Sequence, residues 1–245
     1  TLKTTVTVGG AVEDTYETPF GIRWVSWPKS ETAAAGQNVF KINDKPVFIK
    51  GICEYEHNLG MDHAFTDEMV AASCRMVHSC GFNAFRDAHQ PHNLRYYDHW
   101  DRYGIVCWPQ IESNNRQELL DNKAYTANMV HIVESYVRER RNHPCIVLWG
   151  IYNENSITDH NQWEDIDWDN LATKVKQTIA DLDPTSPAQR LRANCKGGGL
   201  DANYPQHWSG TYGGNWDDYR SRISSPSGEL YGEYGAWAHY RKHTG

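Results

Sequence analysis

The feature that most constrains the fold is an apolar segment that ends abruptly in an acid between two amides. Residues 145–151 are apolar apart from Gly150 and show no polar alternation, and Pro144 ends any helix before them. Such a run is typical of a strand buried on both faces, and hence of a parallel sheet. In a closed parallel barrel the carboxyl ends of the strands carry the chemistry. Asn153 and Glu154 therefore stand where a catalytic pair is displayed.

A second acid lies near the end of another short β-type run, at residues 229–237. Glu233 is flanked there by Gly232 and Gly235, which permit close approach of backbone or ligand. Taken alone, Glu154 has a plainer explanation as an acid that caps the following helix. Two carboxylates at the ends of different strands of one barrel are what glycoside hydrolysis needs. One protonates the leaving oxygen and the other attacks the anomeric carbon.

A strand and helix alternation covers most of the chain. We expect a first strand starting near Val47, further strands at 82–86, 105–108, 145–151, 189–194, 203–208 and 229–235, and helices at 66–80, 93–103, 124–141 and 165–182. This order predicts an α/β fold, a TIM (β/α)8-type barrel. Only ten residues follow Gly235, too few for an eighth strand and its helices. The sequence thus predicts a barrel truncated after its seventh strand.

The amino-terminal segment has a different pattern. Residues 1–8 and 20–27 alternate polar with apolar side chains, which predicts two antiparallel strands joined by a polar connection. Two strands alone are marginally stable in water, so they belong to a larger β-sandwich or pack on the barrel. A hairpin with its turn at residues 43–44 leads into the barrel. We therefore divide the chain into residues 1–38, the end of a sandwich domain and a linker, and residues 39–245, the barrel.

Several motifs, in the same order along the chain, resemble glycoside hydrolase family 2, which contains β-galactosidases, β-glucuronidases and β-mannosidases. They are Phe40-Lys41-Ile42-Asn43 through Gly51, Phe82-Asn83-Ala84-Phe85-Arg86 with His89 and Pro91, Asn153-Glu154 after a tryptophan-bearing strand, and Glu233-Tyr234-Gly235. The resemblance extends from about Phe20 to Trp237. It implies that residues 1–38 end an immunoglobulin-like sandwich domain, and that the eighth barrel strand lies in the missing part of the parent chain.

The resemblance also implies roles for the central residues. Glu154 is expected to be the acid/base and Glu233 the nucleophile of a double displacement that passes through a covalent glycosyl-enzyme and retains configuration. Asn153 would bind the sugar 2-hydroxyl, and Arg86 and His89 would shape the site around the nucleophile. An arginine also favours the ionised form of a nearby carboxylate. The alternative for Arg86 is an ion pair of the barrel core with no further role.

Further substrate contacts are expected from aromatic and polar residues near strand ends. Tyr204 matches a family tyrosine that hydrogen bonds the nucleophile, and His207 and Trp208 follow it as expected sugar contacts. Trp237, just beyond Glu233, can offer its apolar face to sugar C–H groups. The alternative for such rings is packing in the core and between helices.

We expect no metal and no cofactor. Glu112 matches a glutamate of the magnesium site that some relatives carry, but Ser113 and Asn114 do not supply the histidine that goes with it. Glu112 is then expected to bind sugar or to tune Glu154. The loop at 53–65 is rich in acids and histidines yet lacks ordered ligand spacing. Six cysteines without a CxxC pair indicate free thiols rather than a metal site or a functional disulfide.

Composition excludes other partners. A net charge of −7 without a cluster of Lys and Arg argues against nucleic acid, and no apolar run reaches the roughly 20 residues that cross a bilayer. The expected partners are a carbohydrate substrate and the missing sandwich and barrel segments of the parent chain. An open barrel exposes a sheet edge, which invites a homo-oligomer. Because the parent's amino terminus is absent, localisation stays unknown between periplasmic or secreted and cytoplasmic.

The sequence therefore favours a glycoside hydrolase, a retaining exo-β-glycosidase that removes terminal β-D-galactosides. The surroundings of Glu154 at 149–154 and of Glu233 at 232–237 look most similar to the β-galactosidase branch. β-Glucuronidase and β-mannosidase are alternatives within the family. Two other classes compete: a catalytically inactive carbohydrate-binding barrel, and a metal-dependent barrel hydrolase that draws on the 12 histidines.

Overall fold

The computed structural model describes residues 1–28, 39–56, 64–111, 122–153, 167–195, 199–207, 215, 217–218 and 230–234. Its helices are α1 (Asp67–Ser79), α2 (Leu94–Tyr103), α3 (Asn122–Arg140) and α4 (Trp168–Leu182). Its parallel strands are β6 (Gly51–Cys53), β7 (Ala84–Asp87), β8 (Val106–Pro109), β9 (Leu148–Asn153), β10 (Leu191–Cys195), β11 (Ala202–Tyr204), β12 (Gln206–His207) and β13 (Glu233–Tyr234). From β6 to β9 each strand is followed by a helix, which is the predicted alternation.

The parallel strands neighbour one another in sequence order. β7 pairs with β6 and β8, β10 pairs with β9 and β11, and β12 pairs with β13. Bridges from Cys107 to Ile146 and from Gln110 to Gly150 join β8 to β9. β11 and β12 are separated only by Pro205 and act as one strand position, so β13 is the seventh.

The sheet is rolled into a barrel. β7 and β13 are five strand positions apart, which in a flat sheet would separate them by about 24 Å. Instead Arg86 Nη1 on β7 lies 2.5 Å from Glu233 Oε1 on β13. Only a curled sheet brings these strands face to face across a common interior. The barrel predicted from the alternation of strands and helices is therefore confirmed.

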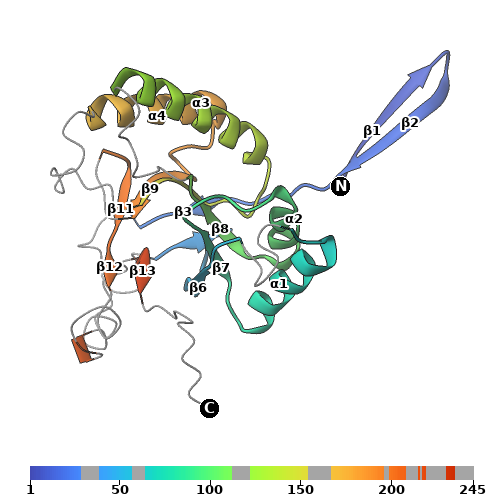
Figure 1. Ribbon diagram of the computed structural model, residues 1–245. Coiled ribbons are helices and arrows are strands. Elements are labelled where there is room, and N and C mark those ends of the chain that lie inside the picture. Colours follow the sequence, from blue (N-terminus) through green and yellow to red (C-terminus); the bar gives the residue numbers. More distant parts are fainter. Residues whose placement is uncertain are drawn as a thin grey trace.

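Helices cover the outside of the sheet (Figure 1). α1 and α2 lie beside β6 to β8, and α3 and α4 run together over β9 and β10. Strand alternation divides the side chains: on β7, Phe85 packs against Trp100 of α2 with ring centroids 4.7 Å apart, whereas Ala84 belongs to the interior cluster. Buried aromatic and aliphatic side chains of the strands and helices thus form one cluster outside the sheet.

Helix boundaries follow local signals in the sequence. The Thr66 side chain accepts a hydrogen bond from Met69 N at the start of α1, and the Asn93 side chain caps α2 in the same way. Gly81, just past α1, has φ +81°, and Gly104 ends α2 with φ +68°. Both predicted helices are confirmed to within two residues of their expected ends.

The barrel interior is closed at the amino-terminal ends of the strands by a small antiparallel sheet, β3 (Val25–Ser26), β4 (Lys41–Ile42) and β5 (Lys45–Pro46). Its Val25 and Phe40 join the interior cluster, which also contains Ala84, Val106, Trp108, Val147, Leu148, Ala193 and Cys195. The turn between β4 and β5 has positive φ at both Asn43 and Asp44, as a tight hairpin requires. The predicted hairpin before the barrel is therefore confirmed.

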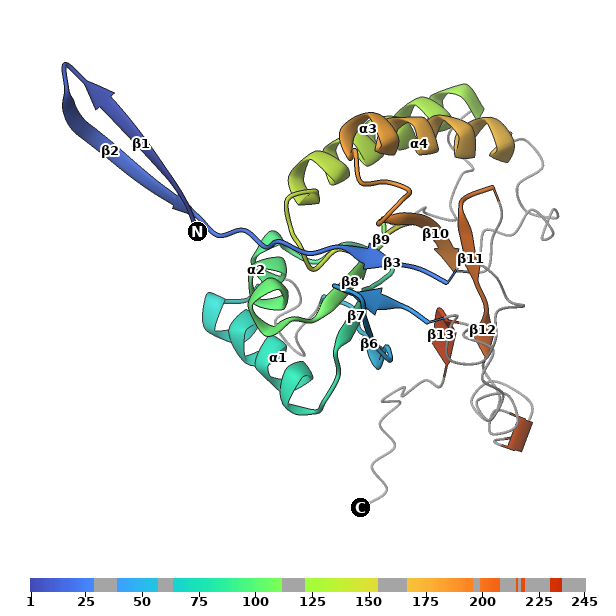
Figure 2. The same cartoon turned by 180° about the vertical axis from the view of Figure 1, so that it is seen from behind.

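Three expectations for the amino-terminal region are wrong. The antiparallel strand expected at 20–27 is reduced to Val25–Ser26, which pairs with β4. The segment treated as a polar connection forms β2 (Ala11–Thr18), which pairs with β1 (Leu2–Val8) across the turn at Gly9 and Gly10. Every residue of this hairpin is exposed and it projects away from the barrel (Figure 2). Alternation is weaker in β2 than in β1, because Asp14 lies between Val12 and Tyr16 on the same face of the strand. In addition, the first barrel strand begins at Gly51 rather than near Val47.

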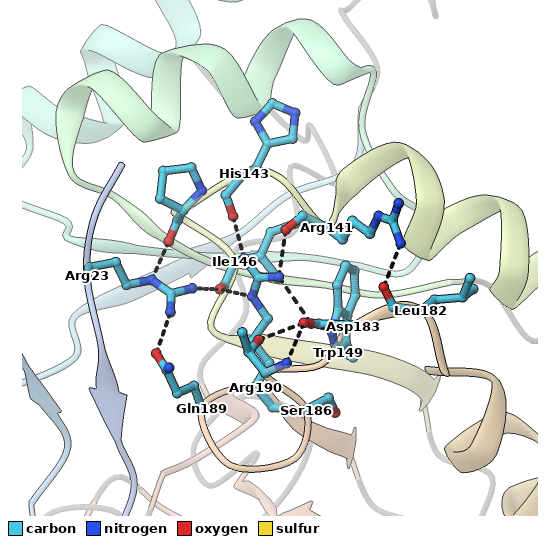
Figure 3. Close-up of polar contacts among 12 residues, drawn as sticks. Arg23, Arg141, His143, Ile146, Trp149, Leu182, Asp183, Ser186, Gln189 and Arg190 are labelled. Atoms are coloured by element: carbon cyan, nitrogen blue, oxygen red, sulfur yellow. Dashed lines mark hydrogen bonds and ion pairs between the residues drawn. The ribbon is translucent and has the colours of Figure 1, made fainter. Parts of the chain in front are cut away.

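A buried polar cluster fixes the segment that carries β3 to the barrel (Figure 3). Arg23 Nε donates to Pro144 O at 2.8 Å, and Arg23 and Arg190 both donate to Ile146 O. Arg190 also contacts Asp183 Oδ2 at 3.1 Å. Burial lowers the pKa of Arg23 to about 10, and repulsion from Arg190 adds to the effect. A hollow of about 490 Å³ lies beside this cluster, at the opposite end of the barrel from Glu233.

Asp183 is the anion of this cluster. Its oxygens accept hydrogen bonds from Trp149 Nε1 at 2.8 Å and from the Thr185 hydroxyl at 2.7 Å, besides the ion pair with Arg190. Burial alone would raise the pKa of Asp183, but the Arg190 guanidinium and these hydrogen bonds outweigh it, so the pKa is lowered. The ionised form therefore stabilises the fold.

Within the described part of the chain, no helix combines the length and the apolar character of a bilayer-spanning segment.

We predict that Asp183→Asn lowers the free energy of unfolding by about 3 kcal/mol at pH 7, because it leaves the buried Arg190 charge without its counterion. A depressed folded-state pKa stabilises above the unfolded value of about 3.9, and this contribution disappears as the pH falls through the folded-state pKa. Urea unfolding from pH 3 to 8 should thus show a constant gap above about pH 5 that narrows below pH 4.

Asp181→Asn is the matched control, because Asp181 is exposed and its side chain accepts a hydrogen bond from the exposed Gln177 on α4. It should change the free energy of unfolding by less than about 0.5 kcal/mol. A gap between wild type and Asp183→Asn that widened below pH 4 would contradict the sign of the effect.

Candidate active site

The candidate site is organised around Arg86, at the carboxyl end of β7. Its Nη1 donates to Glu233 Oε1 at 2.5 Å and to Gly232 O at 3.2 Å. Its Nη2 donates to Gln110 Oε1 at 2.6 Å and to Asn153 Oδ1 at 2.8 Å. One guanidinium therefore joins the carboxyl ends of β7, β8, β9 and β13. Its planar donor geometry suits it to hold several oxygens at once.

Burial makes these partners necessary. Arg86 is 6% exposed and the Glu233 side chain 10%, and a charge so far from water must be paired. The Trp108 ring adds a second contact, with the Arg86 Cζ atom 4.8 Å from its centroid. Tyr204 packs edge-on against Trp108 at 5.4 Å between centroids. Tyr204 thus reaches the ion pair through Trp108, and burial raises the pKa of its hydroxyl well above the usual value.

His89 lies beside the same carboxylate. Its Nε2 is 3.7 Å from Glu233 Oε1, and its ring meets Tyr55 edge-on. The loop that carries His89 is held on the other side of β7 by Asp87, which faces the helices. Asp87 accepts hydrogen bonds from His92 N at 2.9 Å and from the Tyr97 hydroxyl at 2.5 Å.

The His92 ring also contacts Asp87. Burial alone would lower the pKa of His92, but the Asp87 carboxylate outweighs it, so the pKa is raised. Strand alternation therefore sends Arg86 into the barrel and Asp87 outward, and the outward network fixes the loop after the strand. This is how the sequence Arg86-Asp87 positions His89.

Asn153 is the last residue of β9, and its side-chain amide oxygen accepts two hydrogen bonds. Oδ1 accepts from Arg86 and, at 3.4 Å, from Gln206 Nε2 on β12. His207, the next residue, packs its ring edge-on against Tyr231 at 4.4 Å. These contacts link β12 and the start of β13 to the same end of the barrel.

The structure brings together four predicted residues: Arg86, His89, Asn153 and Glu233. Tyr204 and His207 lie on the adjoining strand position, joined to the cluster through Trp108 and Gln206. Glu154, Glu112, Trp208 and Trp237 fall outside the described residues. Sequence reasoning did not assign Gln110 or Gln206, and their only signal was a position directly after or within a predicted strand.

A group of possible metal ligands occurs elsewhere. Asp98, Asp101 and His143 offer ligand atoms within 4.8 Å of one another. Asp101 already accepts from His143 Nδ1 at 2.7 Å and from Cys145 N at 2.8 Å, before β9 begins. These contacts give the group a structural role at the amino-terminal end of the barrel. The loop at 53–65 lies largely outside the described residues.

The geometry at the carboxyl ends suits chemistry on a hydroxylated ligand. One oxygen of the buried Glu233 carboxylate is held by the Arg86 guanidinium, and the His89 imidazole lies near it. The side-chain amide of Asn153, on β9, is oriented by the same guanidinium. Such a constellation can present a nucleophilic oxygen and hydrogen-bond donors to the same small space.

We predict that Gly232→Ala disturbs this site through Cys195. A Cβ at position 232 would fall on Cys195 Sγ, and 3.3 Å from Cys195 Cβ. The overpacking should lower the free energy of unfolding by about 2 kcal/mol, measured by urea titration. In a Cys195→Ala background the sulfur is gone, so the cost of Gly232→Ala should fall by about 1 kcal/mol.

Gly51→Ala on β6 is the control, because its Cβ would meet only ordinary contacts, the nearest at 3.7 Å. Its cost should be the same with and without Cys195. Equal costs of Gly232→Ala in both backgrounds would show that the close approach to Cys195 does not constrain position 232.

Comparison with known proteins places the chain. The family model described as "Glycosyl hydrolases family 2, TIM barrel domain" matches residues 34–194. A putative beta-glucuronidase of Formosa agariphila is 26% identical over 251 residues, covering 100% of this chain and 29% of that protein. A beta-galactosidase of Vibrio cholerae is 30% identical over 153 residues, covering 54% of this chain and 15% of that protein.

Solved structures agree on the fold. A beta-glucuronidase of Parabacteroides merdae superposes with a TM-score of 0.76 at 22% identity, covering 97% of this chain and 29% of that one. A putative beta-galactosidase of Bacteroides fragilis superposes with a TM-score of 0.71 at 19% identity, covering 99% and 36%. The chain thus spans about a third or less of these relatives. With two thirds of its length matched by the family model, the chain belongs to glycoside hydrolase family 2, as part of its TIM barrel domain.

Proposed function

We propose that the protein to which this chain belongs is a retaining β-glycosidase, with Glu233 as nucleophile and Glu154 as acid/base. The observation that carries the proposal is the contact of Arg86 with both Glu233 and Asn153 at the carboxyl ends of the barrel strands. In such barrels these ends form the active site. Family membership supports hydrolysis of glycosides as the reaction class.

The contacts of Glu233 assign its two oxygens different roles. Oε1 is held by Arg86 and lies near His89. Oε2 makes no hydrogen bond or ion pair within the described part of the chain and is left to attack the anomeric carbon. As that bond forms, the bond to the leaving oxygen breaks, and Glu154 donates its proton to that oxygen.

In the second step Glu154 takes a proton from water, the water oxygen bonds to the anomeric carbon, and Glu233 leaves as a carboxylate. Two inversions at one carbon give net retention. This sequence requires the two carboxyl groups to lie roughly 5 to 5.5 Å apart. Arg86 remains beside Glu233 throughout and stabilises the carboxylate both before attack and on release.

Asn153 supplies a donor to the sugar. Its amide oxygen faces Arg86 and Gln206, so Nδ2 must point away from both. We assign this group to the 2-hydroxyl, where hydrogen bonds strengthen in the transition state. Tyr204 and His207 flank the same space, and Glu112, Trp208 and Trp237 complete the proposed substrate contacts.

Terminal β-D-galactosides are the proposed substrates. Support comes from the curated relatives named beta-galactosidase, which are 30% identical over 54% to 64% of this chain. β-D-Glucuronides are a second candidate with equal support, because the relative aligned over the whole chain and the superposed structure from Parabacteroides merdae are named beta-glucuronidases. Both candidates require the same two carboxylates and differ in the pocket around the sugar.

We also propose that the hairpin of β1 and β2 completes a β-sandwich formed by other parts of the protein. Apolar residues Leu2, Val6, Val12 and Tyr16 are more than half exposed on it. A two-stranded hairpin without a packed face is marginal in water, so further strands would give it a core. The domain boundary near residue 38 rests on this proposal.

Glu233→Ala should reduce kcat for a nitrophenyl β-glycoside by more than about 10³-fold, because the covalent step is lost. Added azide fits the space of the missing carboxylate and should restore turnover with formation of the α-glycosyl azide, identified by NMR. Glu134→Ala, at an exposed position of α3, should keep wild-type kcat. Undiminished turnover by Glu233→Ala would end the assignment.

A panel of nitrophenyl glycosides tests the substrate. The full-length protein should give its highest kcat/KM on β-D-galactoside, and the β-D-glucuronide and β-D-mannoside are the comparisons. A preference for the glucuronide would select the second candidate. Hydrolysis of α-glycosides alone, or release of an inverted sugar by NMR, would contradict the retaining mechanism of β-glycosides.

A further inference from the structure

The four oxygens that surround Arg86 differ in charge. Three are neutral amide or peptide oxygens, from Gln110, Asn153 and Gly232, and only Glu233 is a carboxylate. Among the described residues, the guanidinium therefore shares its charge with a single acid. We propose that Gln110 is a positioning residue that holds Arg86 in place without competing for its charge. This inference rests on the proposed role of Glu233 as nucleophile.

Gln110 is held rigidly. It follows β8 directly and is 1% exposed. Its backbone N donates to Asp87 O at 3.0 Å, and it bridges to Gly150 of β9. A Cβ on Gly150 would lie 2.5 Å from Trp108 Nε1, so β8 and β9 touch closely at this level. The backbone of Gln110 is consequently fixed between β7, which carries Arg86, and β9, which carries Asn153.

The orientation of its amide follows from its partner. A guanidinium only donates hydrogen bonds, so Gln110 must turn Oε1 towards Arg86. The 2.6 Å distance from Oε1 to Arg86 Nη2 is short, as expected when the donor is charged. Gln110 Nε2 then points elsewhere, and it is buried with no hydrogen-bond partner among the described residues.

A buried donor without a partner costs stability. Methionine would avoid that cost but offer Arg86 no oxygen. Glutamate would offer an oxygen of the same shape but would add a second negative charge beside the guanidinium. Glutamine is the residue of this size that gives an oxygen and no charge. The stability lost through the unpaired Nε2 is therefore explained by the need of the Arg86–Glu233 ion pair for an uncharged oxygen, and not by packing.

A second carboxylate on Arg86 would act on Glu233 by repulsion. Both acids would contact the same guanidinium, one at each terminal nitrogen, which places them within about 5 Å of each other. At an effective dielectric constant near 20 such charges interact by several kcal/mol, enough to move a titration by at least about one pH unit. The ionised nucleophile would then form only at higher pH.

The test uses the full-length protein with Gln110→Glu and Gln110→Met. In Gln110→Glu the acidic limb of the pH profile of kcat/KM should move up by about one pH unit or more. The rate at which a 2-deoxy-2-fluoro β-glycoside labels Glu233, followed by mass spectrometry, should shift in parallel. In Gln110→Met the limb should stay in place while kcat falls about tenfold and KM changes less than about twofold, because one charged hydrogen bond is lost.

Gln177→Glu is the matched control, because it makes the same chemical change at an exposed position of α4 and should leave the profile unchanged. An acidic limb of folded Gln110→Glu at the wild-type pH would overturn the proposal, whatever its absolute rate. So would a Gln110→Met protein with kcat within about twofold of wild type, which decides the matter if Gln110→Glu fails to fold. Wild-type protein that is not labelled at Glu233 would instead overturn the proposed function.

Discussion

The structure depends on one buried ion pair, between Arg86 and Glu233. It joins the second and the seventh strand position of the barrel, which contact each other only because the sheet is rolled. A guanidinium at 6% exposure must find oxygens, and it finds four of them, at β8, β9 and β13. Closure of the described barrel and assembly of the candidate site are therefore the same event. A change that opens the sheet also removes the partners of Glu233.

Because side chains alternate between the two faces of a strand, β7 contributes both to the candidate site and to the packing of the helices. On β7, Ala84 and Arg86 face the interior, whereas Phe85 and Asp87 face the helices. Arg86 orders the site directly, and Asp87 orders the loop that carries His89. A second polar cluster, around Asp183 and Arg190, joins segments of the chain at the amino-terminal ends of the strands. The two clusters lie at opposite ends of the barrel, so the cluster around Asp183 can be altered without touching the candidate site around Arg86.

Much of this arrangement could be predicted from the sequence. Runs of apolar residues marked the buried strands, and caps such as Thr66 and Asn93 marked the helices, because these signals are local. Asn153 and Glu233 were proposed from their places near the ends of β-type runs, and Arg86 from the resemblance to the family; the structure brings the three side chains together. The strand β2 was missed because Asp14 interrupts the apolar face that Val12 and Tyr16 share, so the alternation that marked β1 is not evident there. Gln110 was missed because its role depends on where Arg86 points, which no neighbour in the sequence reveals.

The most direct measurement is a crystal structure of the full-length protein after reaction with a 2-deoxy-2-fluoro β-glycoside. The account predicts a covalent bond from Glu233 Oε2 to the anomeric carbon, with Oε1 still on Arg86. In the unreacted protein the carboxyl groups of Glu233 and Glu154 should lie roughly 5 to 5.5 Å apart. A sugar bound to another residue, or carboxyl groups separated by more than about 8 Å, would contradict it.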